Sequence, residues 1–389
     1  MNNLVWYSQV HANTGTANFC RSQCLSLHKL KLFDSINIVP DPFVPTTLKE
    51  PVLQAMIQRQ VDLKDKILVQ VMWPERWYAT ISEHPKYFIG YNAIEGTKIP
   101  YNWVSIMNDD DVDLVITMST PMSKLFIENG VNPNKLFALG HGVDTDKFKP
   151  LPDKDSNGTK LGYVRPYTFL YVNGWRTSIG RKDRKGPEIL LDAWYKGGFW
   201  QDPDVQLYMK LNMVYEEQPR DIYADIKKHL GYDLTQWKNV IIDDVNYPEE
   251  ELPKIYKNAD VFVSPTKGEG FGITIAEAMS TGLPVIVPFN EYAGYMDFCY
   301  PNNVKKAIFI RIDHTEEIDS RLMGHLYSGS KWHIPSTEHL IQQMWSCYKN
   351  KEKVKKIGLD GREEIVKNWT WDSASFKLVT ELKRRGIYG

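Results

Sequence analysis

The sequence predicts an α/β protein made of two domains, and three observations lead to that prediction. The chain has 389 residues, whereas one ordinary domain has roughly 100 to 200. Short β-type runs alternate with helical stretches in both halves, which is typical of parallel sheets covered by helices. Between the halves, residues 151–165 are rich in Asp, Gly, Lys and Pro and interrupt the apolar pattern. We expect the domain boundary in this segment.

The first half begins with a strand-like run at residues 4–10 (LVWYSQV). A small polar loop then leads to a helix that we expect to begin near Ala17, as in a βα unit. Further β-type runs lie at 67–73, 86–94, 112–118 and 135–140. Because these runs alternate with helical stretches, we expect a parallel sheet with helices on both faces.

The second half repeats this pattern. Its β-type runs lie at 167–173, 205–211, 239–245, 259–265 and 283–288. The amphipathic segment 369–385 predicts a long final helix whose apolar face carries Phe376, Leu378, Val379 and Leu382. We expect two Rossmann-like domains that face each other across a cleft, formed by residues 1–155 and 156–369, with the helix in 370–389 completing the first.

The charge balance gives no reason to expect a bulk polyanionic partner. The chain carries 47 Lys and Arg against 48 Asp and Glu, a formal net charge of −1, so we expect no bulk binding of nucleic acid. Its four cysteines are too few for a disulfide framework and lack the paired spacing of a zinc site. We expect them to be reduced packing residues: Cys20, Cys24, Cys299 and Cys347.

The sequence also bears on location. The first residues, MNNLVWYSQVHANTG, lack a basic leader followed by an apolar core and a cleavage site, so we interpret them as a first strand. No stretch approaches the ~18 uninterrupted apolar residues that span a bilayer. We therefore expect a cytoplasmic protein, either free or held peripherally at a membrane. The sequence does not predict its oligomeric state.

The most informative segment is 267–287, KGEGFGITIAEAMSTGLPVIV, which follows a predicted strand. Its glycines at 268, 270 and 272 would let backbone N–H groups approach an anion at the start of the next helix, and a diphosphate is the natural anion. Glu269 and Glu277 flank this anion site, and carboxylates suit sugar and ribose hydroxyl groups. The alternative is a plain glycine-rich turn with two unconnected glutamates.

This segment resembles the family-4 retaining glycosyltransferases of GT-B fold, the glycogen-synthase-like group. The family signature places two glutamates in an EGFG…EAM.(S/C/T)GLPVI frame. The matching residues are Glu269, Gly270, Phe271, Gly272, Glu277, Ala278, Met279, Gly282, Leu283 and Pro284. The resemblance extends to ELPKIYKNADVFVSP (251–265) and to the linker sequence GVDTDKF (142–148).

The resemblance implies a role for each part of the signature. Glu269 would contact the donor sugar, and Glu277 would hold the ribose. Backbone groups of Gly270, Phe271 and Gly272 would meet the diphosphate or the sugar. Thr274 is a further candidate beside them.

The family also uses an Arg and a Lys to neutralise the leaving diphosphate, which stabilises the developing charge without a metal ion. Lys185 matches the family lysine. Arg176 is our assignment for the arginine, although it lies nine residues upstream, and Arg181 and Arg184 compete with it. The run RKDRK (181–185) also fits a solvated surface loop.

In GT-B enzymes the first domain mostly binds the acceptor. Gly15 is one glycine where relatives often carry two, and we expect it to approach the donor phosphates. Glu95 follows the run 86–94, at the place where relatives often carry a His, and would orient the acceptor or the sugar. It fits equally well as a carboxylate that binds backbone N–H groups in a turn.

Other polar and aromatic residues carry weaker signals. We favour a structural role for His141 at the linker, and the lone His11 is weak evidence of a site. The acidic run 109–111 lies between a helix and a strand, where Asp is an ordinary turn residue, so we assign no metal site. The aromatic segment 73–78 fits either a sugar-stacking platform or core packing.

Together these features predict a retaining, metal-independent glycosyltransferase. The donor would be a UDP, GDP or ADP sugar, bound as substrate with no further cofactor, and the acceptor a glycan, a lipid or another hydroxyl compound. Two alternatives stay open. One is a catalytically silent nucleotide-sugar-binding or scaffold protein of the same fold, and the other is a different GT-B enzyme such as an epimerase or a phosphorylase.

Overall fold

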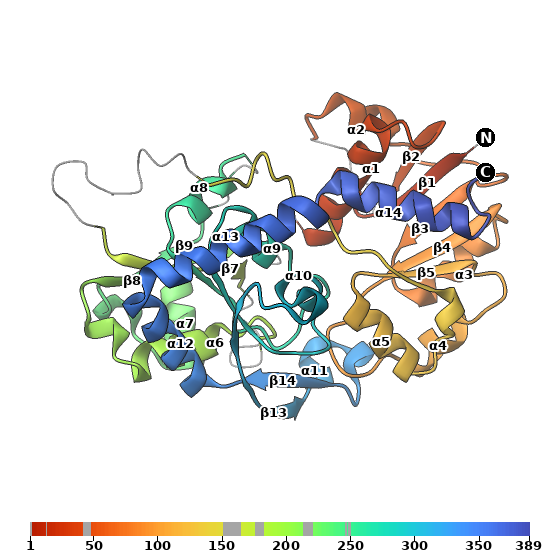
Figure 1. Cartoon of the computed structure of the whole chain (residues 1–389). Helices are drawn as coiled ribbons and strands as arrows, with labels where there is room; N and C mark the ends of the chain where they lie inside the picture. Colours follow the sequence, from red (N-terminus) through yellow and green to blue (C-terminus); the bar gives the residue numbers. More distant parts are fainter. Residues whose placement is uncertain are drawn as a thin grey trace.

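Two six-stranded parallel sheets lie side by side and form the centres of two domains (Figure 1). The computed structural model describes residues 2–12, 14–41, 48–150, 165–175, 183–212, 221–245, 247 and 250–389. The expected boundary segment 151–165 therefore lies, apart from Arg165, outside the described residues. Strands from the first half of the chain form one sheet and strands from the second half form the other, so the α/β alternation in each half corresponds to a separate sheet.

The first sheet has the strand order β2-β1-β3-β4-β5-β6. Its strands are β1 (Asn3–Ser8), β2 (Ser35–Pro40), β3 (Ile67–Val71), β4 (Tyr87–Asn92), β5 (Leu114–Thr117) and β6 (Leu136–Ala138). All its pairings are parallel. The central strands β3 and β5 are buried along their whole length, because helices cover both faces.

The second sheet has the order β12-β11-β10-β7-β8-β9. Its strands are β7 (Tyr167–Gly174), β8 (Val205–Asn212), β9 (Val240–Asp243), β10 (Val261–Val263), β11 (Val285–Pro288) and β12 (Ile308–Ile310). Each β-type run predicted from the sequence overlaps one strand of the two sheets. The predicted runs miss β2 and β12.

Helices cover both faces of the first sheet. The apolar faces of α1 (Gly15–Lys29) and α2 (Pro51–Met56) pack on one side. On the other side pack α3 (Trp77–Ile81), α4 (Tyr101–Met107) and α5 (Thr120–Glu128). Helix α1 begins at Gly15, two residues before Ala17, because the Thr14 side chain accepts a hydrogen bond from the Ala17 N–H and caps the helix.

The second sheet is covered in the same way. One face packs against α6 (Pro187–Lys196), α7 (Ile222–Leu230) and α12 (Thr337–Lys349). The other packs against α8 (Leu252–Lys257), α9 (Ile273–Ser280), α10 (Met296–Cys299) and α13 (Lys351–Asn368). This layering leaves the carboxyl ends of the strands free for loops, which is where ligands bind in open α/β sheets.

The last helix, α14 (Trp371–Arg384), returns to the first domain and lies along α1 (Figure 1). Leu378, Val379 and Leu382 are buried there, but Phe376 is 52% exposed. The prediction that Phe376 belongs to the apolar face is wrong. At 100° per residue it lies more than 90° from the direction in which the three buried side chains point.

Two chain segments cross side by side between the domains. A parallel bridge pairs Val143 with Thr370, and the Val143 N–H donates to the carbonyl oxygen of Trp369 over 2.8 Å. A Cβ atom at Gly142 would lie 2.3 Å from the backbone nitrogen of Trp371. The two crossings are therefore packed backbone against backbone.

An antiparallel hairpin extends from the second domain and is absent from the sequence prediction. Its strands are β13 (Ile312–Glu317) and β14 (Lys331–Pro335), with the short helix α11 (Ser320–Met323) and the 3₁₀ turn η8 (His325–Tyr327) between them. It lies at the lower edge of Figure 1, next to the gap between the domains.

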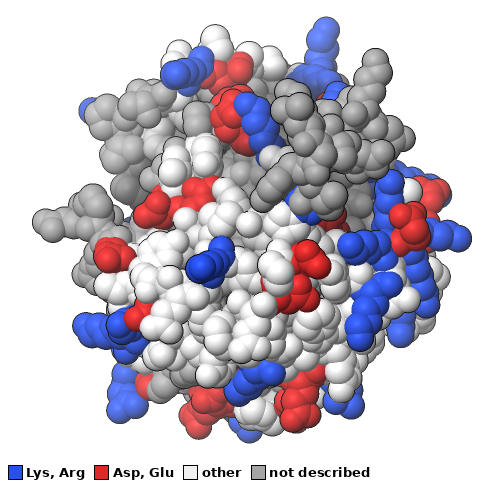
Figure 2. All heavy atoms as spheres, turned by 90° about the vertical axis from the view of Figure 1, so that its left-hand side faces the viewer, with Lys and Arg blue, Asp and Glu red and all other residues white. Residues whose placement is uncertain are grey.

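Surface charge is mixed on the face of the second domain shown in Figure 2, where acidic and basic side chains lie among each other. All four cysteines are buried and unpaired, as their sparse spacing predicts. Within the described ranges, no helix combines the length and the apolar character needed to cross a membrane.

Candidate active site

Residues 268–272, which we call the glycine turn, lie between β10 and α9, at the carboxyl end of the second sheet. Gly272 precedes α9 with a φ of 93°, a left-handed conformation that glycine adopts without strain. The Gly294 N–H donates to the Glu269 carbonyl oxygen over 2.8 Å, and a Cβ atom at Gly294 would lie 1.9 Å from the Gly270 oxygen. Close backbone packing therefore fixes the path of the turn.

The same turn touches the first domain. A Cβ atom at Gly270 would lie 3.2 Å from the sulfur of Met118 and 3.5 Å from the Cβ of Ala93. A Cβ atom at Gly268 would lie 3.4 Å from the Cβ of Glu95. Because these residues follow β4 and β5, the carboxyl ends of the two sheets meet at the glycine turn.

Glu269 is buried at the centre of a charged network. Its carboxylate lies 2.6 Å from the Lys185 ammonium and 3.2 Å from the Arg184 guanidinium. Burial alone would raise the pKa of Glu269, but Lys185 and Arg184 outweigh it and hold the pKa below its usual value. The carboxylate is therefore ionised at neutral pH.

Arg184 connects this network to the first domain. Its second terminal nitrogen lies 3.3 Å from the Glu95 carboxylate, whereas the nitrogen that contacts Glu269 also donates to the carbonyl oxygen of Gly268. Burial would lower the pKa of Arg184, whereas Glu95 and Glu269 raise it further than burial lowers it. Burial lowers the pKa of Lys185 despite its contact with Glu269. Two cations and two carboxylates thus meet where the domains face each other.

Backbone contacts hold the two cations in place. The carbonyl oxygen of Arg184 accepts from the Lys267 N–H over 2.8 Å. The Lys185 N–H donates to Asp183 over 2.9 Å, and the Lys185 carbonyl oxygen accepts from the Tyr171 hydroxyl over 3.2 Å. Residues 183–185, just before α6, are therefore held against both the glycine turn and β7.

A second, buried ion pair lies next to these residues. The Lys267 ammonium lies 2.6 Å from the Glu188 carboxylate, and both side chains are buried. Burial raises the pKa of Glu188 to about 7, although Lys267 lowers it. This pair joins the start of α6 to the start of the glycine turn, so it positions the loops from which Glu269 and Lys185 extend.

Glu277 lies on α9 and is also buried. The Tyr256 hydroxyl, from α8, donates to its carboxylate over 2.7 Å. Burial raises the pKa of Tyr256 most, and the neighbouring Glu277 carboxylate raises it further. The phenol therefore stays protonated and donates the hydrogen bond. Tyr256 is not among the residues predicted from the sequence, although it lies in segment 251–265, which resembles the family.

The aromatic residue of the turn has a packing role. Phe271 is buried against His141, Phe298 and Trp369, so only its backbone remains to contact a ligand. His141 also stacks on Phe19, and burial lowers its pKa to about 3. This is the structural environment that the sequence favours for His141.

The remaining predicted residues are more scattered. Thr274 is half-buried in the first turn of α9, and Gly15 begins α1 in the other domain, where an added Cβ would meet no atom within 4 Å. Arg176 and Arg181 lie outside the described residues. Of the three competing arginines, Arg184 is the one that the structure describes, and it contacts Glu269.

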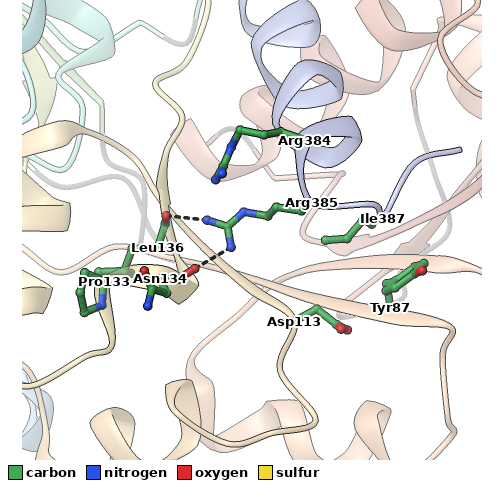
Figure 3. A pocket seen from close by; sticks show the side chains of 8 residues that line it. All are labelled: Tyr87, Asp113, Pro133, Asn134, Leu136, Arg384, Arg385 and Ile387. Atoms are coloured by element: carbon green, nitrogen blue, oxygen red, sulfur yellow. Dashed lines mark hydrogen bonds between the residues drawn. The ribbon is translucent and has the colours of Figure 1, made fainter.

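A small pocket lies between the glycine turn, the loop after β4 that contains Glu95 (the Glu95 loop), and the hairpin β13–β14. Its lining residues are Glu95, Gly96, Lys267, Gly268, Glu269, Asn290, Tyr292, Lys331 and His333. A larger, open pocket lies at the opposite end of the first sheet (Figure 3). There Arg385 donates to the carbonyl oxygens of Asn134 and Leu136, which gives it a structural role.

No three His, Cys, Asp or Glu side chains gather as metal ligands within the part of the chain that the structure describes. In the acidic run, the Asp109 side chain accepts a hydrogen bond from the Asp111 N–H over 3.0 Å. The run forms a turn between α4 and β5.

Sequence comparison finds relatives that are named as sugar-transferring enzymes. Residues 177–290 match the family model "Glycosyl transferases group 1". An α-1,3-galactosyltransferase of Escherichia coli that acts on a diphosphoundecaprenol-linked sugar is 25% identical over 50% of this chain and 47% of its own length. The sulfoquinovosyl transferase SQD2 of Arabidopsis thaliana is 22% identical over 71% of this chain and 45% of its own length. The chain thus spans less than half the length of these relatives.

Solved structures share the whole architecture. HepE of Anabaena in complex with UDP superposes with a TM-score of 0.67 at 14% identity, covering 99% of this chain and 100% of HepE. Sucrose-phosphate synthase of Thermosynechococcus elongatus gives a TM-score of 0.69 at 15% identity, covering 100% of this chain and 99% of its own. The chain therefore has the GT-B fold, as the sequence predicts.

Proposed function

We propose that this protein is a glycosyltransferase that moves a sugar from a nucleotide diphosphate donor to a hydroxyl acceptor. The matched family model covers the segment that carries Lys185, Glu269 and Glu277, and relatives named as glycosyltransferases support the same activity. HepE has also been solved with UDP-glucose, which favours a UDP sugar as donor.

One observation carries the proposal, which is the contact of buried Glu269 with Lys185 and Arg184 beside the glycine turn. An ionised carboxylate accepts hydrogen bonds from sugar hydroxyl groups. Two fixed cations next to it suit a diphosphate. Sugar and diphosphate are the two parts of the donor between which the reacting bond lies.

In the reaction, the bond from C1 of the sugar to the diphosphate oxygen breaks, and its electron pair stays on that oxygen. The acceptor oxygen forms a new bond to C1, and its proton passes to the released diphosphate. Lys185 and Arg184 stabilise the growing negative charge, so no metal ion is required. The anomeric configuration is retained, as the resemblance to family-4 enzymes implies.

A donor screen tests this function. The protein is incubated with UDP, GDP and ADP sugars and with candidate glycan or lipid acceptors, and release of nucleoside diphosphate is measured with and without EDTA. We expect release that EDTA leaves unchanged, and a product whose anomeric proton coupling in NMR matches that of the donor. Binding without release would instead indicate a catalytically silent binding protein, and loss of release with EDTA would contradict metal independence.

A further inference from the structure

The hairpin β13–β14 holds the loop that follows β4. Ser330 is completely buried, and its hydroxyl oxygen accepts from the N–H groups of Thr97 and Lys98 over 2.9 and 3.1 Å. The Lys331 N–H donates to the Thr97 hydroxyl over 3.0 Å. A Cβ atom at Gly96 would lie 2.3 Å from the Ser330 hydroxyl oxygen, so glycine permits this close approach.

Two further bonds from the same element reach Glu95 itself. The Tyr327 hydroxyl donates to the Glu95 carboxylate over 2.9 Å, and the indole N–H of Trp332 donates to the Glu95 carbonyl oxygen over 2.9 Å. Trp332 is 4% exposed. Glu95 is thus fixed at both its backbone and its carboxylate by residues of the other domain, while the carboxylate also contacts Arg184.

The hairpin also supplies one wall of the small pocket beside Glu269. Lys331 and His333 line it together with the two carboxylates. His333 stacks on Tyr292, with ring centroids 5.6 Å apart, and the Tyr292 hydroxyl donates to Glu128 over 3.0 Å. Burial lowers the pKa of His333, so it is a neutral imidazole at pH 7. Tyr292 therefore holds His333 by ring stacking and is itself held by Glu128.

The groups that meet in this pocket suit one class of ligand. Carboxylates accept hydrogen bonds from hydroxyl groups, whereas an ammonium and an imidazole N–H donate to hydroxyl oxygens. Because the space is small, these donors and acceptors match one or two hydroxyl groups at the edge of a sugar ring. The pocket adjoins Glu269 on the hairpin side, away from Glu277 on α9.

We propose that the hairpin β13–β14 forms the wall of the sugar-binding part of the site, with Lys331 and His333 contacting the transferred sugar. Tyr327 and Trp332 act as positioning residues that hold Glu95 beside that sugar. This inference rests on the proposed function and adds the residues that discriminate one donor sugar from another.

Calorimetric binding tests the wall directly, because it needs no turnover. The dissociation constants of UDP and of UDP-glucose are measured for the wild type, for Lys331→Ala, for His333→Ala and for the exposed control Lys305→Ala. We expect each wall variant to weaken UDP-glucose binding about five- to tenfold, the size of one or two lost hydrogen bonds. UDP binding should stay within about twofold, since UDP lacks the sugar.

Equal weakening of both ligands, or no effect on either, would overturn the assignment of the wall. If the wild type binds UDP-glucose and releases UDP from it while the wall variants behave like Lys305→Ala, the hairpin proposal fails and the proposed function stands. If the wild type neither binds nor turns over any nucleotide sugar, the proposed function itself fails.

A double-mutant cycle tests the positioning role. Tyr327→Phe removes the hydroxyl that holds Glu95, so its effect should disappear once Glu95 is Ala, which leaves no acceptor for that hydroxyl. We expect Tyr327→Phe to lower kcat for UDP-glucose about fivefold in the wild-type background and less than twofold beside Glu95→Ala. Ser328→Ala, elsewhere in the hairpin, serves as the control. Independent, multiplying effects would show that Tyr327 does not act through Glu95.

Discussion

The guanidinium of Arg184 lies 3.3 Å from the carboxylate of Glu95, although the two residues belong to different domains. The same guanidinium contacts Glu269, so it is held by one carboxylate from each side. Neither carboxylate alone accounts for the position of this arginine. The charged centre of the site is therefore complete only when the two domains meet.

Glu269→Gln should reduce turnover about 100-fold or more, in the range measured for loss of one preorganised polar group in an active site. The amide keeps the shape of the side chain but not its charge, so Lys185 and Arg184 lose their shared anion. We therefore also expect a lower melting temperature. Steady-state rates and thermal melts check both effects, with the exposed Glu352→Gln as control. A nearly normal rate would contradict the role of Glu269.

Loss of either cation should weaken binding of the nucleoside diphosphate. We expect Lys185→Ala and Arg184→Met each to raise the dissociation constant about tenfold, which is about 1.4 kcal/mol. The physical reason is the loss of a charge-assisted contact with the diphosphate. Titration calorimetry measures this, and the exposed Lys353→Met should bind like the wild type. Unchanged affinity in both variants would show that the diphosphate does not bind beside Lys185 and Arg184.

Glu277 should discriminate nucleotides from simple anions. Glu277→Ala removes a carboxylate suited to the ribose hydroxyl groups, so we expect UDP to bind about tenfold more weakly while pyrophosphate binding stays unchanged. Tyr256→Phe should cause a smaller loss in the same direction, because its hydroxyl holds that carboxylate. Competition binding against both ligands checks the pattern. Equal losses for UDP and pyrophosphate would argue against a ribose contact.

Because His141 is buried and neutral, we expect the free energy of unfolding to fall at acidic pH. Burial lowers its pKa from about 6.5 to about 3, so between these values the unfolded chain binds a proton that the folded chain does not. The stability that His141 contributes is complete above pH 6.5 and is lost as the pH falls towards 3, by up to about 1.4 kcal/mol per pH unit. His141→Phe keeps a flat ring within the aromatic stack.

Urea unfolding at pH 7 and at pH 5 measures this effect. The wild type should lose more stability between the two values than His141→Phe does. Because the same carboxylates titrate in both proteins, their contribution to the pH dependence of stability cancels in the comparison. An identical loss in the two proteins would mean that His141 is not a buried neutral histidine.

The sequence predicts the parts of the fold that arise from local pattern. Largely apolar runs such as β3 and β5 indicate buried strands, because helices cover both faces of the sheet. The glycine turn was also predictable, since glycines 268, 270 and 272 follow a predicted strand, and Gly272 adopts the positive φ that favours glycine. Residue type and spacing alone were sufficient there.

Contacts between distant segments were not predictable in this way. Strand β13 is mostly exposed and rich in charged residues, so no apolar alternation marks it. It is held by pairing with β14, and β14 docks on the Glu95 loop more than 200 residues earlier in the sequence. Likewise, RKDRK offers several cations of similar type, and only the fold brings Arg184 between two carboxylates.

The paired crossings at Val143 and Thr370 restrict how the halves of this molecule can move. A lone connecting segment could both bend and twist, but two strands bonded side by side resist torsion about their common direction. We therefore expect relative motion of the two domains to occur mainly as bending at these crossings rather than as twisting. Restricted twisting would keep Arg184 facing Glu95 whenever the two domains meet.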